Sequence, residues 1–292
     1  MSPKGELSFE NTAPKERGVE YIKTLAEIEH ILDQSEEEQE EYINKRIQTL
    51  SNAAASGKVS LFDHDIHRGF LGPKMEIYRN LMVDPFVMDD SDLYKDLFET
   101  IKKFKSSEGW QERTLREIIP NALQWTLSKY FGNIVANSNT ESQNQEFYLD
   151  HSSIDSPTIS IKELRGKSFA VCAEKSAATQ NMLAFLGMES ELIASSNCRI
   201  PAESEEVAHY YILAHGPKTD MIYDPTNPQL LLDVEGRYTS YGAAMYPITE
   251  EQSQHILAGG SIVLEHTDIQ INEAGERIPQ KQNRQYTGPK IR

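Results

Sequence analysis

Three residues in the second half of the chain have the side chains, and the order, of a nucleophile, a general base and the residue that orients the base. They are Cys172, His209 and Asp224, separated by 37 and 15 residues. A cysteine thiolate attacks a carbonyl carbon, a histidine transfers the proton, and a carboxylate fixes the histidine tautomer. Brought together, three such residues would support nucleophilic catalysis by the cysteine.

The local sequence around Cys172 favours a thiolate. Residues 172–186 are predicted as a helix that ends at Gly187, with Ser168 as the expected N-cap. Cys172 then lies in the first turn, where unpaired N–H groups and the helix dipole stabilise negative charge. Lowering a cysteine pKa from about 8.5 to about 7 raises the thiolate fraction at neutral pH from a few per cent to about half. That shift requires roughly 2 kcal/mol, which a dipole and one imidazolium together can supply.

His209 and Asp224 are predicted to lie on the two strands of one β-hairpin. The strand that starts at His209 is followed by a Gly-Pro-Lys turn at 216–218, and the returning strand ends at Asp224, just before a proline. A hairpin centred between residues 216 and 217 pairs residues whose numbers sum to 433. It would place His209 directly opposite Asp224, at about 5 Å. A slip of one residue would put the two side chains on opposite faces.

These segments resemble three ordered blocks of the transglutaminase-like superfamily. The run Cys172-Ala-Glu-Lys-Ser-Ala-Ala-Thr, continued by Met182-Leu183 and Leu186-Gly187-Met188, is similar to the nucleophile helix of that superfamily. His209-Tyr210-Tyr211 and Asp224-Pro225-Thr226 resemble its later blocks, a histidine followed by strand residues and then Asp-Pro-Thr. The resemblance covers about 60 of the 292 residues.

The resemblance implies a papain-like cysteine enzyme with a Cys-His-Asp triad that acts on a peptide bond or a glutamine amide. Cys172 would form the thioester, His209 would take and return the proton, and Asp224 would fix the tautomer of His209. The substrate would be a protein or peptide. Peptidase, deamidase and transamidase activities all stay open. Hydrolysis is favoured over cross-linking, because the chain has no calcium-type acidic loops.

The second donor to the oxyanion also stays open. The backbone N–H of Cys172 would be one donor, and a further donor is needed. The better-known transglutaminases use an upstream tryptophan, but neither Trp110 nor Trp125 is close to Cys172 in sequence. The sequence offers alternative donors without choosing among them: Gln143, Asn144 and Gln145.

Apolar spacing predicts helices in the first half of the chain, over 19–50, 93–104 and 112–130, and short β-type runs follow residue 158. The expected fold class is α+β, with a nucleophile helix packed on an antiparallel sheet in a papain-like, transglutaminase-like core. The expected organisation is a flexible leader (1–18), a mainly helical region (19–132), the catalytic core (145–266) and a polar, basic C-terminal tail (267–292). From residue 277 the tail has five basic residues and no acidic one.

The composition argues against several classes of protein. The charge is 29 − 45 = −16, which disfavours binding to nucleic acid or to anionic membranes. No apolar run is long enough for a membrane span, and the first residues lack the apolar stretch of a signal peptide. Two cysteines are too few for a disulfide scaffold and fit a reducing compartment. We expect a cytoplasmic protein, with non-classical export left open.

Neither a metal nor a cofactor is expected. The rival site Asp63-His64-Asp65-Ile66-His67 lacks the spacing of a zinc motif, and no phosphate-binding glycine loop is present. Cys198 has no helix-start context and is expected to be a packed thiol. His215, about 20 Å along the strand from His209, is expected to be a loop residue.

The alternative function is a catalytically inactive transglutaminase-like module that binds other proteins. Residues 36–41 contain five acidic side chains in six positions, which would suit a basic protein partner. Such a run more often forms the solvated face of a helix. The geometry of Cys172 distinguishes the two functions, since a thiol far from His209 would favour the module.

Overall fold

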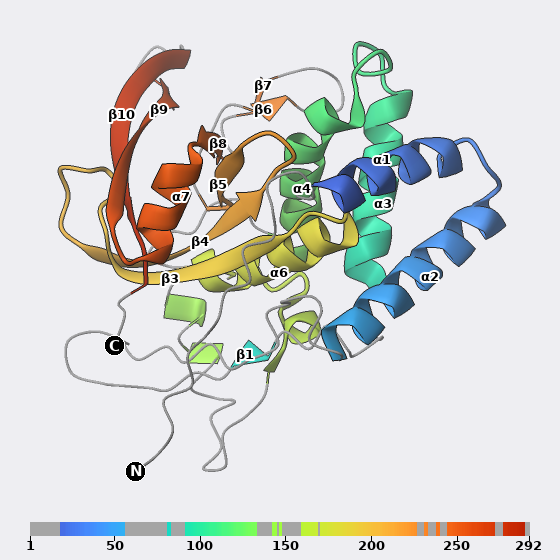
Figure 1. The fold of residues 1–292 in the computed structure, drawn as a ribbon, viewed down its shortest axis with the longest axis horizontal. Coiled ribbons are helices and arrows are strands. Elements are labelled where there is room, and N and C mark those ends of the chain that lie inside the picture. The colour runs from blue at the N-terminus through green and yellow to red at the C-terminus, as the bar shows by residue number, and fades with distance from the viewer. Residues whose placement is uncertain are drawn as a thin grey trace.

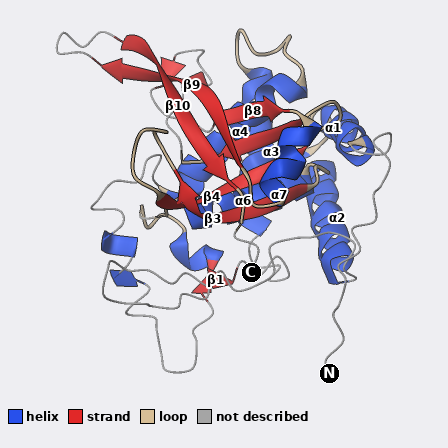
Figure 2. Ribbon diagram, turned by 60° about the vertical axis from the view of Figure 1, so that its left-hand side comes forward, coloured by secondary structure: helices blue, strands red, loops and turns tan. Residues whose placement is uncertain are grey.

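The computed structural model describes residues 18–55, 81–82, 91–132, 142–144, 146–147, 159–168, 170–226, 231–232, 238–239, 244–271 and 277–289. Residues 1–17 of the expected leader and the rival segment 63–67 lie outside these ranges. Helices cover one face of a central antiparallel sheet, and a β-hairpin with a short helix covers the other (Figures 1 and 2). The mixed class of helix and antiparallel sheet that the sequence predicted is confirmed.

The described residues of the region expected to be mainly helical include the helices α1 (Val19–Ile31), α2 (Glu36–Ala55), α3 (Ser91–Ser106) and α4 (Leu115–Phe131). Their apolar side chains pack together and around a fifth helix, α6 (Cys172–Phe185). Trp110 and Trp125 both belong to this core. Trp110 lies edge-on to Phe104, with ring centroids 4.7 Å apart.

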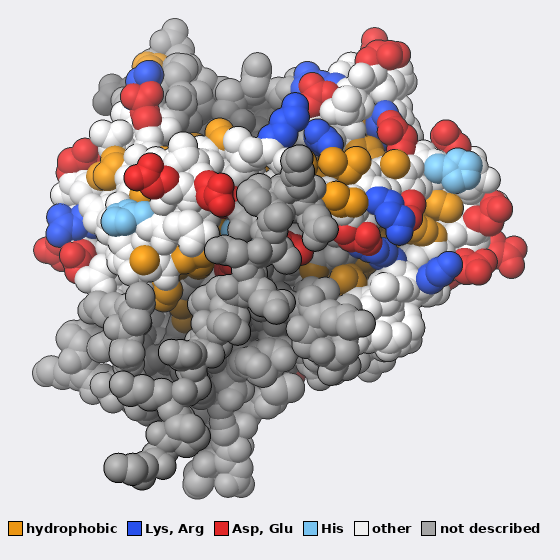
Figure 3. All heavy atoms as spheres, viewed as in Figure 1, with side chains coloured by type: hydrophobic (Ala, Val, Ile, Leu, Met, Phe, Trp, Pro, Cys, Tyr) orange, Lys and Arg blue, Asp and Glu red, His pale blue; other side chains and the backbone are white. Residues whose placement is uncertain are grey.

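The acidic run begins α2, where negative side chains stabilise the helix dipole. Glu38 caps the helix by accepting a hydrogen bond from the Ser35 backbone N–H at 3.0 Å. Glu40 pairs with Lys95 of α3 at 3.0 Å. Acidic and basic side chains are interspersed over this half of the molecule (Figure 3). These contacts are those of a solvated helix face.

The central sheet has four antiparallel strands in the order β3 (Ser190–Cys198), β4 (Val207–His215), β5 (Asp220–Asp224) and β8 (Ala244–Ile248). Alternate residues of β4 face opposite layers. Tyr210 and Ile212 pack with the helices, whereas Tyr211 and Leu213 pack with the second layer. The second layer consists of α7 (Glu250–Leu257), β9 (Ser261–Ile271) and β10 (Arg277–Thr287).

Helix α6 is enclosed between the sheet and the other helices, so even its polar side chains are buried. Each of these side chains needs a hydrogen-bond partner. The Ser176 hydroxyl donates to the Tyr210 carbonyl of β4, and the Gln180 amide donates to the Ser190 carbonyl of β3. Asn181 donates to a carbonyl one turn earlier in α6. The bonds of Ser176 and Gln180 join the helix to the sheet.

The two ends of α6 differ in how well the sequence predicted them. The end at Gly187 is confirmed, with a left-handed φ of 78°. The prediction of Ser168 as the N-cap is wrong. Val171 is the N-cap, and Glu174 accepts its backbone N–H at 2.9 Å. Ser168 lies outside the helix and donates instead to the Gly132 carbonyl.

The β4–β5 hairpin has a longer turn than expected. Its strand pairs include Ile212 with Tyr223 and His215 with Asp220, so paired residue numbers sum to 435 instead of 433. The turn is the four-residue segment 216–219, and the register is therefore shifted by two residues. A shift of two preserves the face of every side chain. His209 is consequently a diagonal neighbour of Asp224 rather than its direct partner.

The C-terminal segment is not the flexible tail that its polar composition suggested. Residues 277–287 form β10, which pairs with β9 along its whole length. Arg284 and Tyr286 of β10 are buried, whereas Lys281 and Asn283 of the same strand are exposed. β10 also forms an isolated antiparallel bridge, through Gln285, with Arg199, the residue that follows β3.

Shorter elements complete the described part of the chain. β1 (Leu81–Met82) pairs in parallel with β2 (Ile159–Ser160), and β6 (Leu231–Leu232) pairs with β7 (Tyr238–Thr239). The strand expected over 158–161 is thus only two residues long. It continues as the 3₁₀ turn Ile161–Leu164.

We predict that Gly187→Ala destabilises the protein more than Gly109→Ala. Both glycines have a φ near 80°, at 78° and 79°. A Cβ at Gly187 would lie 2.7 Å from the Thr24 hydroxyl and 2.8 Å from the Glu20 carbonyl of α1, whereas nothing lies within 4 Å at Gly109. Urea denaturation should give a difference of about 1–3 kcal/mol, the typical cost of overpacking. Equal losses would show that α1 does not pack tightly on this turn.

Candidate active site

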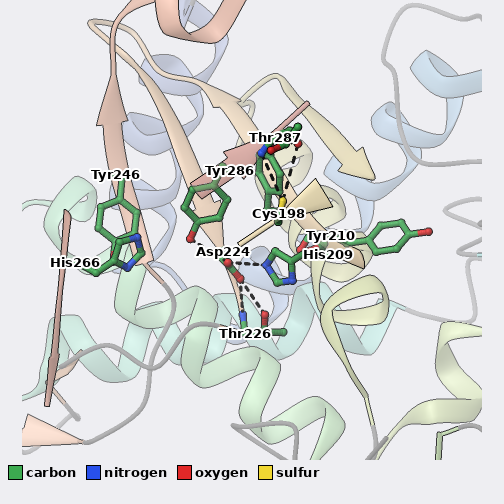
Figure 4. Close-up of polar contacts among 11 residues, drawn as sticks. Cys198, His209, Tyr210, Asp224, Thr226, Tyr246, His266, Tyr286 and Thr287 are labelled. Carbon is green, nitrogen blue, oxygen red and sulfur yellow. Dashed lines mark hydrogen bonds and ion pairs between the residues drawn. The ribbon is translucent and has the colours of Figure 1, made fainter. Parts of the chain in front are cut away.

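The site is built around a buried bond between His209, near the start of β4, and Asp224, at the end of β5 (Figure 4). His209 Nε2 lies 2.7 Å from Asp224 Oδ2. His209 is 8% exposed and Asp224 has no exposed surface. The structure thus brings these two predicted residues together, although the register that places them differs from the predicted one.

Asp224 is fixed by further donors on both of its oxygens. Oδ1 accepts the Thr226 backbone N–H at 3.1 Å and the Thr226 hydroxyl at 2.9 Å. Oδ2 accepts the Tyr286 hydroxyl at 3.0 Å, in addition to His209. Sequence reasoning missed Thr226 and Tyr286 as members of the site. The Asp-Pro-Thr turn could have revealed Thr226, because an aspartate often accepts a hydrogen bond from the backbone two residues on.

Burial and pairing act in opposite directions on both partners. Burial alone lowers the pKa of His209, but the charge and the hydrogen bond of Asp224 raise that pKa well above its usual value. Burial likewise raises the pKa of Asp224, but the charge of His209 and the hydrogen bonds from His209 and Thr226 lower it overall. The pair is therefore a carboxylate with an imidazolium that releases its proton reluctantly.

Cys172 is the first residue of α6, and its side chain is a reduced, partly exposed thiol. Its side chain is hydrogen-bonded to His209, and this contact adds to the raised pKa of the imidazole. Because Asp224 engages Nε2 of His209, Nδ1 is the ring nitrogen that remains for the thiol. All three sequence-predicted site residues therefore lie in one connected group.

Two buried ionisable residues lie next to Cys172 in the first turns of α6. Glu174 accepts the Val171 N–H, as described above, and also the Asn144 amide at 3.3 Å. Burial lowers the pKa of Lys175 to about 8, against the opposing effect of the charges of Glu174 and Cys172. The start of α6 is thus an enclosed, polar environment.

The structure separates the three alternative oxyanion donors. Asn144 is buried beside the start of α6, where it bonds to Glu174. Gln143 is exposed, and Gln145 lies outside the described residues. Among the described candidates, the side chain of Asn144 thus contacts the start of α6.

Cys198 is a fully buried free thiol in β3, in keeping with the expected packing role. Its sulfur accepts the Thr287 backbone N–H at 3.5 Å. Burial raises the pKa of Cys198, and the nearby His209 opposes that rise. The two cysteines form no disulfide.

His215 is not the loop residue that the sequence suggested. It is the last residue of β4 and is buried. Nδ1 lies 3.0 Å from Asp220, and Nε2 bonds to Glu191 of β3. Burial alone would lower the pKa of His215, but the hydrogen bonds and charges of Asp220 and Glu191 raise it to about 9.

Comparison with known proteins gives no relative from which a function could be transferred. No family model, no curated protein and no solved structure matches the chain. Within the described ranges, no three or more His, Cys, Asp or Glu side chains are grouped to hold a metal ion. The helices found in these ranges are all too short or too polar to cross a membrane.

We predict that His215 makes stability decrease as the pH rises through about 9. The folded pKa of about 9 exceeds the unfolded value of about 6.5, so the stabilisation is complete below pH 6.5 and is lost as the folded imidazolium deprotonates. Between pH 6.5 and pH 9, the free energy of unfolding of the wild-type protein should fall by roughly 2 kcal/mol more than that of His215→Gln. Urea denaturation across the range checks this.

His30→Gln is the matched control, because His30 is an exposed histidine on α1. The two variants should differ in how their free energy of unfolding depends on pH. If His215→Gln and His30→Gln depend on pH alike, the contacts of His215 do not contribute to stability through protonation.

Proposed function

We propose that the protein is a transglutaminase-like cysteine enzyme that transfers an acyl group from a peptide bond or a glutamine amide. The observation that supports this most directly is the connected group at the start of α6, in which Cys172 bonds to His209 and His209 bonds to buried Asp224. The proposed base thus contacts the proposed nucleophile on one side and the orienting carboxylate on the other, which is the order that such a triad requires.

In the first half of the reaction, the Cys172 thiolate attacks the carbonyl carbon. A C–S bond forms, and the carbonyl electrons move to the oxygen, where the Cys172 backbone N–H at the helix start is a donor. The C–N bond then breaks as the His209 imidazolium gives its proton to the leaving nitrogen. Ammonia leaves from a glutamine amide and an amine leaves from a peptide, and a thioester remains on Cys172.

In the second half, His209 acts as a base toward the incoming acceptor. Water loses a proton to His209 and attacks the thioester carbonyl. The C–S bond breaks, the acid is released, and the Cys172–His209 pair returns to its starting state. A primary amine in place of water would give transamidation by the same steps. We favour water as the acceptor, in line with the sequence-based prediction of hydrolysis over cross-linking.

Asp224 has an electrostatic and an orienting role in this scheme. It fixes the imidazole through Nε2, so that Nδ1 points to the sulfur, and it stabilises the positive charge on His209 while the thiolate exists. Thr226 prevents the carboxylate from rotating by binding its other oxygen. We propose that the sheet and α6 form the papain-like core that the sequence resemblance implies.

We predict that Cys172 is alkylated by iodoacetamide well below pH 8 and that His209→Ala abolishes this reactivity. The adjacent imidazolium favours the thiolate, which is the reacting form. Mass spectrometry at a series of pH values reads both cysteines in one experiment, and buried Cys198 should stay unmodified in the folded protein. If Cys172 titrates as an ordinary thiol in both proteins, the enzyme proposal is wrong and a binding module is favoured.

We predict that Cys172→Ser and His209→Ala each lower acyl-transfer activity by on the order of 10³-fold or more, because triad members act as a unit. The assay uses casein and a glutamine-containing peptide. New N-termini report peptidase activity, released ammonia reports deamidation, and an incorporated primary amine reports transamidation.

Cys198→Ser is the matched control for this assay, since it makes the same exchange of sulfur for oxygen outside the triad. It should retain activity in proportion to its folded fraction. Activity that survives Cys172→Ser would refute the role of this residue as nucleophile, and amine incorporation above hydrolysis would reverse the preference for water.

A further inference from the structure

We propose that Tyr286 is a positioning residue of the triad. Its phenol holds Asp224 in place and weakens the interaction of Asp224 with the His209 imidazolium. This inference rests on the proposed function and extends it to a residue 62 positions after Asp224 in the chain. Tyr286 lies in β10, in the segment that the sequence suggested was a tail.

The phenol and the imidazole share one carboxylate oxygen. The Tyr286 hydroxyl lies 3.0 Å from Asp224 Oδ2, and His209 Nε2 lies 2.7 Å from the same atom. Both side chains point to Asp224 from opposite sides (Figure 4). Since Thr226 occupies Oδ1, Tyr286 is the donor that competes directly with the imidazolium for charge on Oδ2.

The packing around β10 fixes the position of the Tyr286 phenol. Tyr286 has no exposed surface. Its ring lies edge-on to Tyr211, with centroids 5.0 Å apart, and stacks with His266 of β9 at 6.0 Å. The Tyr211 hydroxyl in turn donates to the Thr287 carbonyl of β10 at 3.0 Å. The ring is therefore clamped between two layers, and its hydroxyl is directed at the carboxylate.

This geometry has a definite electrostatic consequence. A hydroxyl that donates to a carboxylate stabilises the negative charge and reduces the attraction of that oxygen for a second donor. Burial raises the pKa of Tyr286 well above its usual value, so the phenol stays a donor over the working pH range. Tyr286 thus limits how strongly Asp224 retains the proton on His209, which must be released to the leaving group during the reaction.

Other titratable groups surround the three residues and must stay unchanged in any test. They are Cys172 of α6, Cys198 of β3, Tyr211 of β4, Tyr223 of β5, Tyr246 of β8, His266 of β9 and Arg284 of β10. A substitution that removes only one hydroxyl meets this requirement.

The test compares Tyr286→Phe with the wild-type protein by two readouts that need no substrate. Nitrogen-15 NMR of the histidine rings follows His209 with pH, with His209→Ala identifying its signal, and alkylation follows Cys172. We expect Tyr286→Phe to raise the pH at which His209 deprotonates by about half a unit or more. The alkylation midpoint of Cys172 should move to lower pH, because a better-stabilised imidazolium favours the thiolate.

Tyr211→Phe is the matched control. It also removes one hydroxyl and one hydrogen bond from the same buried cluster, but its bond is to the Thr287 carbonyl and not to Asp224. Tyr211→Phe should lower the free energy of unfolding, measured in urea, by a similar amount. It should leave the titration of His209 and the alkylation midpoint of Cys172 at their wild-type pH values. A purely structural role for Tyr286 would instead make the two variants alike.

The outcomes separate this proposal from the proposed function. A shift of both titrations in Tyr286→Phe alone supports the positioning role. Unshifted titrations, or equal shifts in both variants, overturn it. If wild-type Cys172 behaves as an ordinary thiol, the enzyme proposal fails, and the NMR titration of His209 still decides whether Tyr286 acts on the pair.

Discussion

A fully buried carboxylate is the constraint on which much of this structure depends. An ionised aspartate without partners would cost several kcal/mol of desolvation, and Asp224 has no exposed surface. Its partners come from β4, from the turn after β5 and from β10. These segments must all be in place for the charge to be tolerated. The contacts that complete the environment of Asp224 are therefore also contacts that join the central sheet to β10 of the second layer.

The position of the site between two hydrophobic clusters explains how its members meet. His209 and Asp224 lie on the sheet face that packs against β10, whereas Cys172 belongs to a helix on the other face. His209 is near the start of β4, beyond the last residue paired with β5, so its ring can reach around the end of the sheet. The proposed triad is assembled there because a thiol of the helical layer meets an imidazole and a carboxylate of the sheet at one end of the sheet.

Much of this arrangement could be predicted from the sequence, because its signals are local. The helix that starts at Cys172 and ends at Gly187 follows from residue type and spacing, and so do the helices of the first half. The predicted contact of His209 with Asp224 is observed although the predicted register was wrong by two residues. Every second side chain along a strand lies on the same face, so this error left both side chains on the same face. An error of one residue would have separated them.

The parts that could not be predicted depend on contacts between distant segments. β10 is polar on its outer face, and its buried residues Arg284 and Tyr286 are too few to distinguish a strand from a tail. Ser168 has the residue type of an N-cap, but the chain turns with a φ of 62° there and starts the helix later. His215 is buried only because Asp220 and Glu191 provide partners from neighbouring strands.

The place of β10 in the chain sets an order of events during synthesis. Cys172, His209 and Asp224 all leave the ribosome before Tyr286 does, and a nascent chain that stops short of β10 has a carboxylate with one donor missing. The central sheet can pair before then, but β10, which covers Asp224, follows later in the chain. In the proposed enzyme, the nucleophile is thus made before the strand that completes the partners of Asp224, and its synthesis is separated in time from its activation.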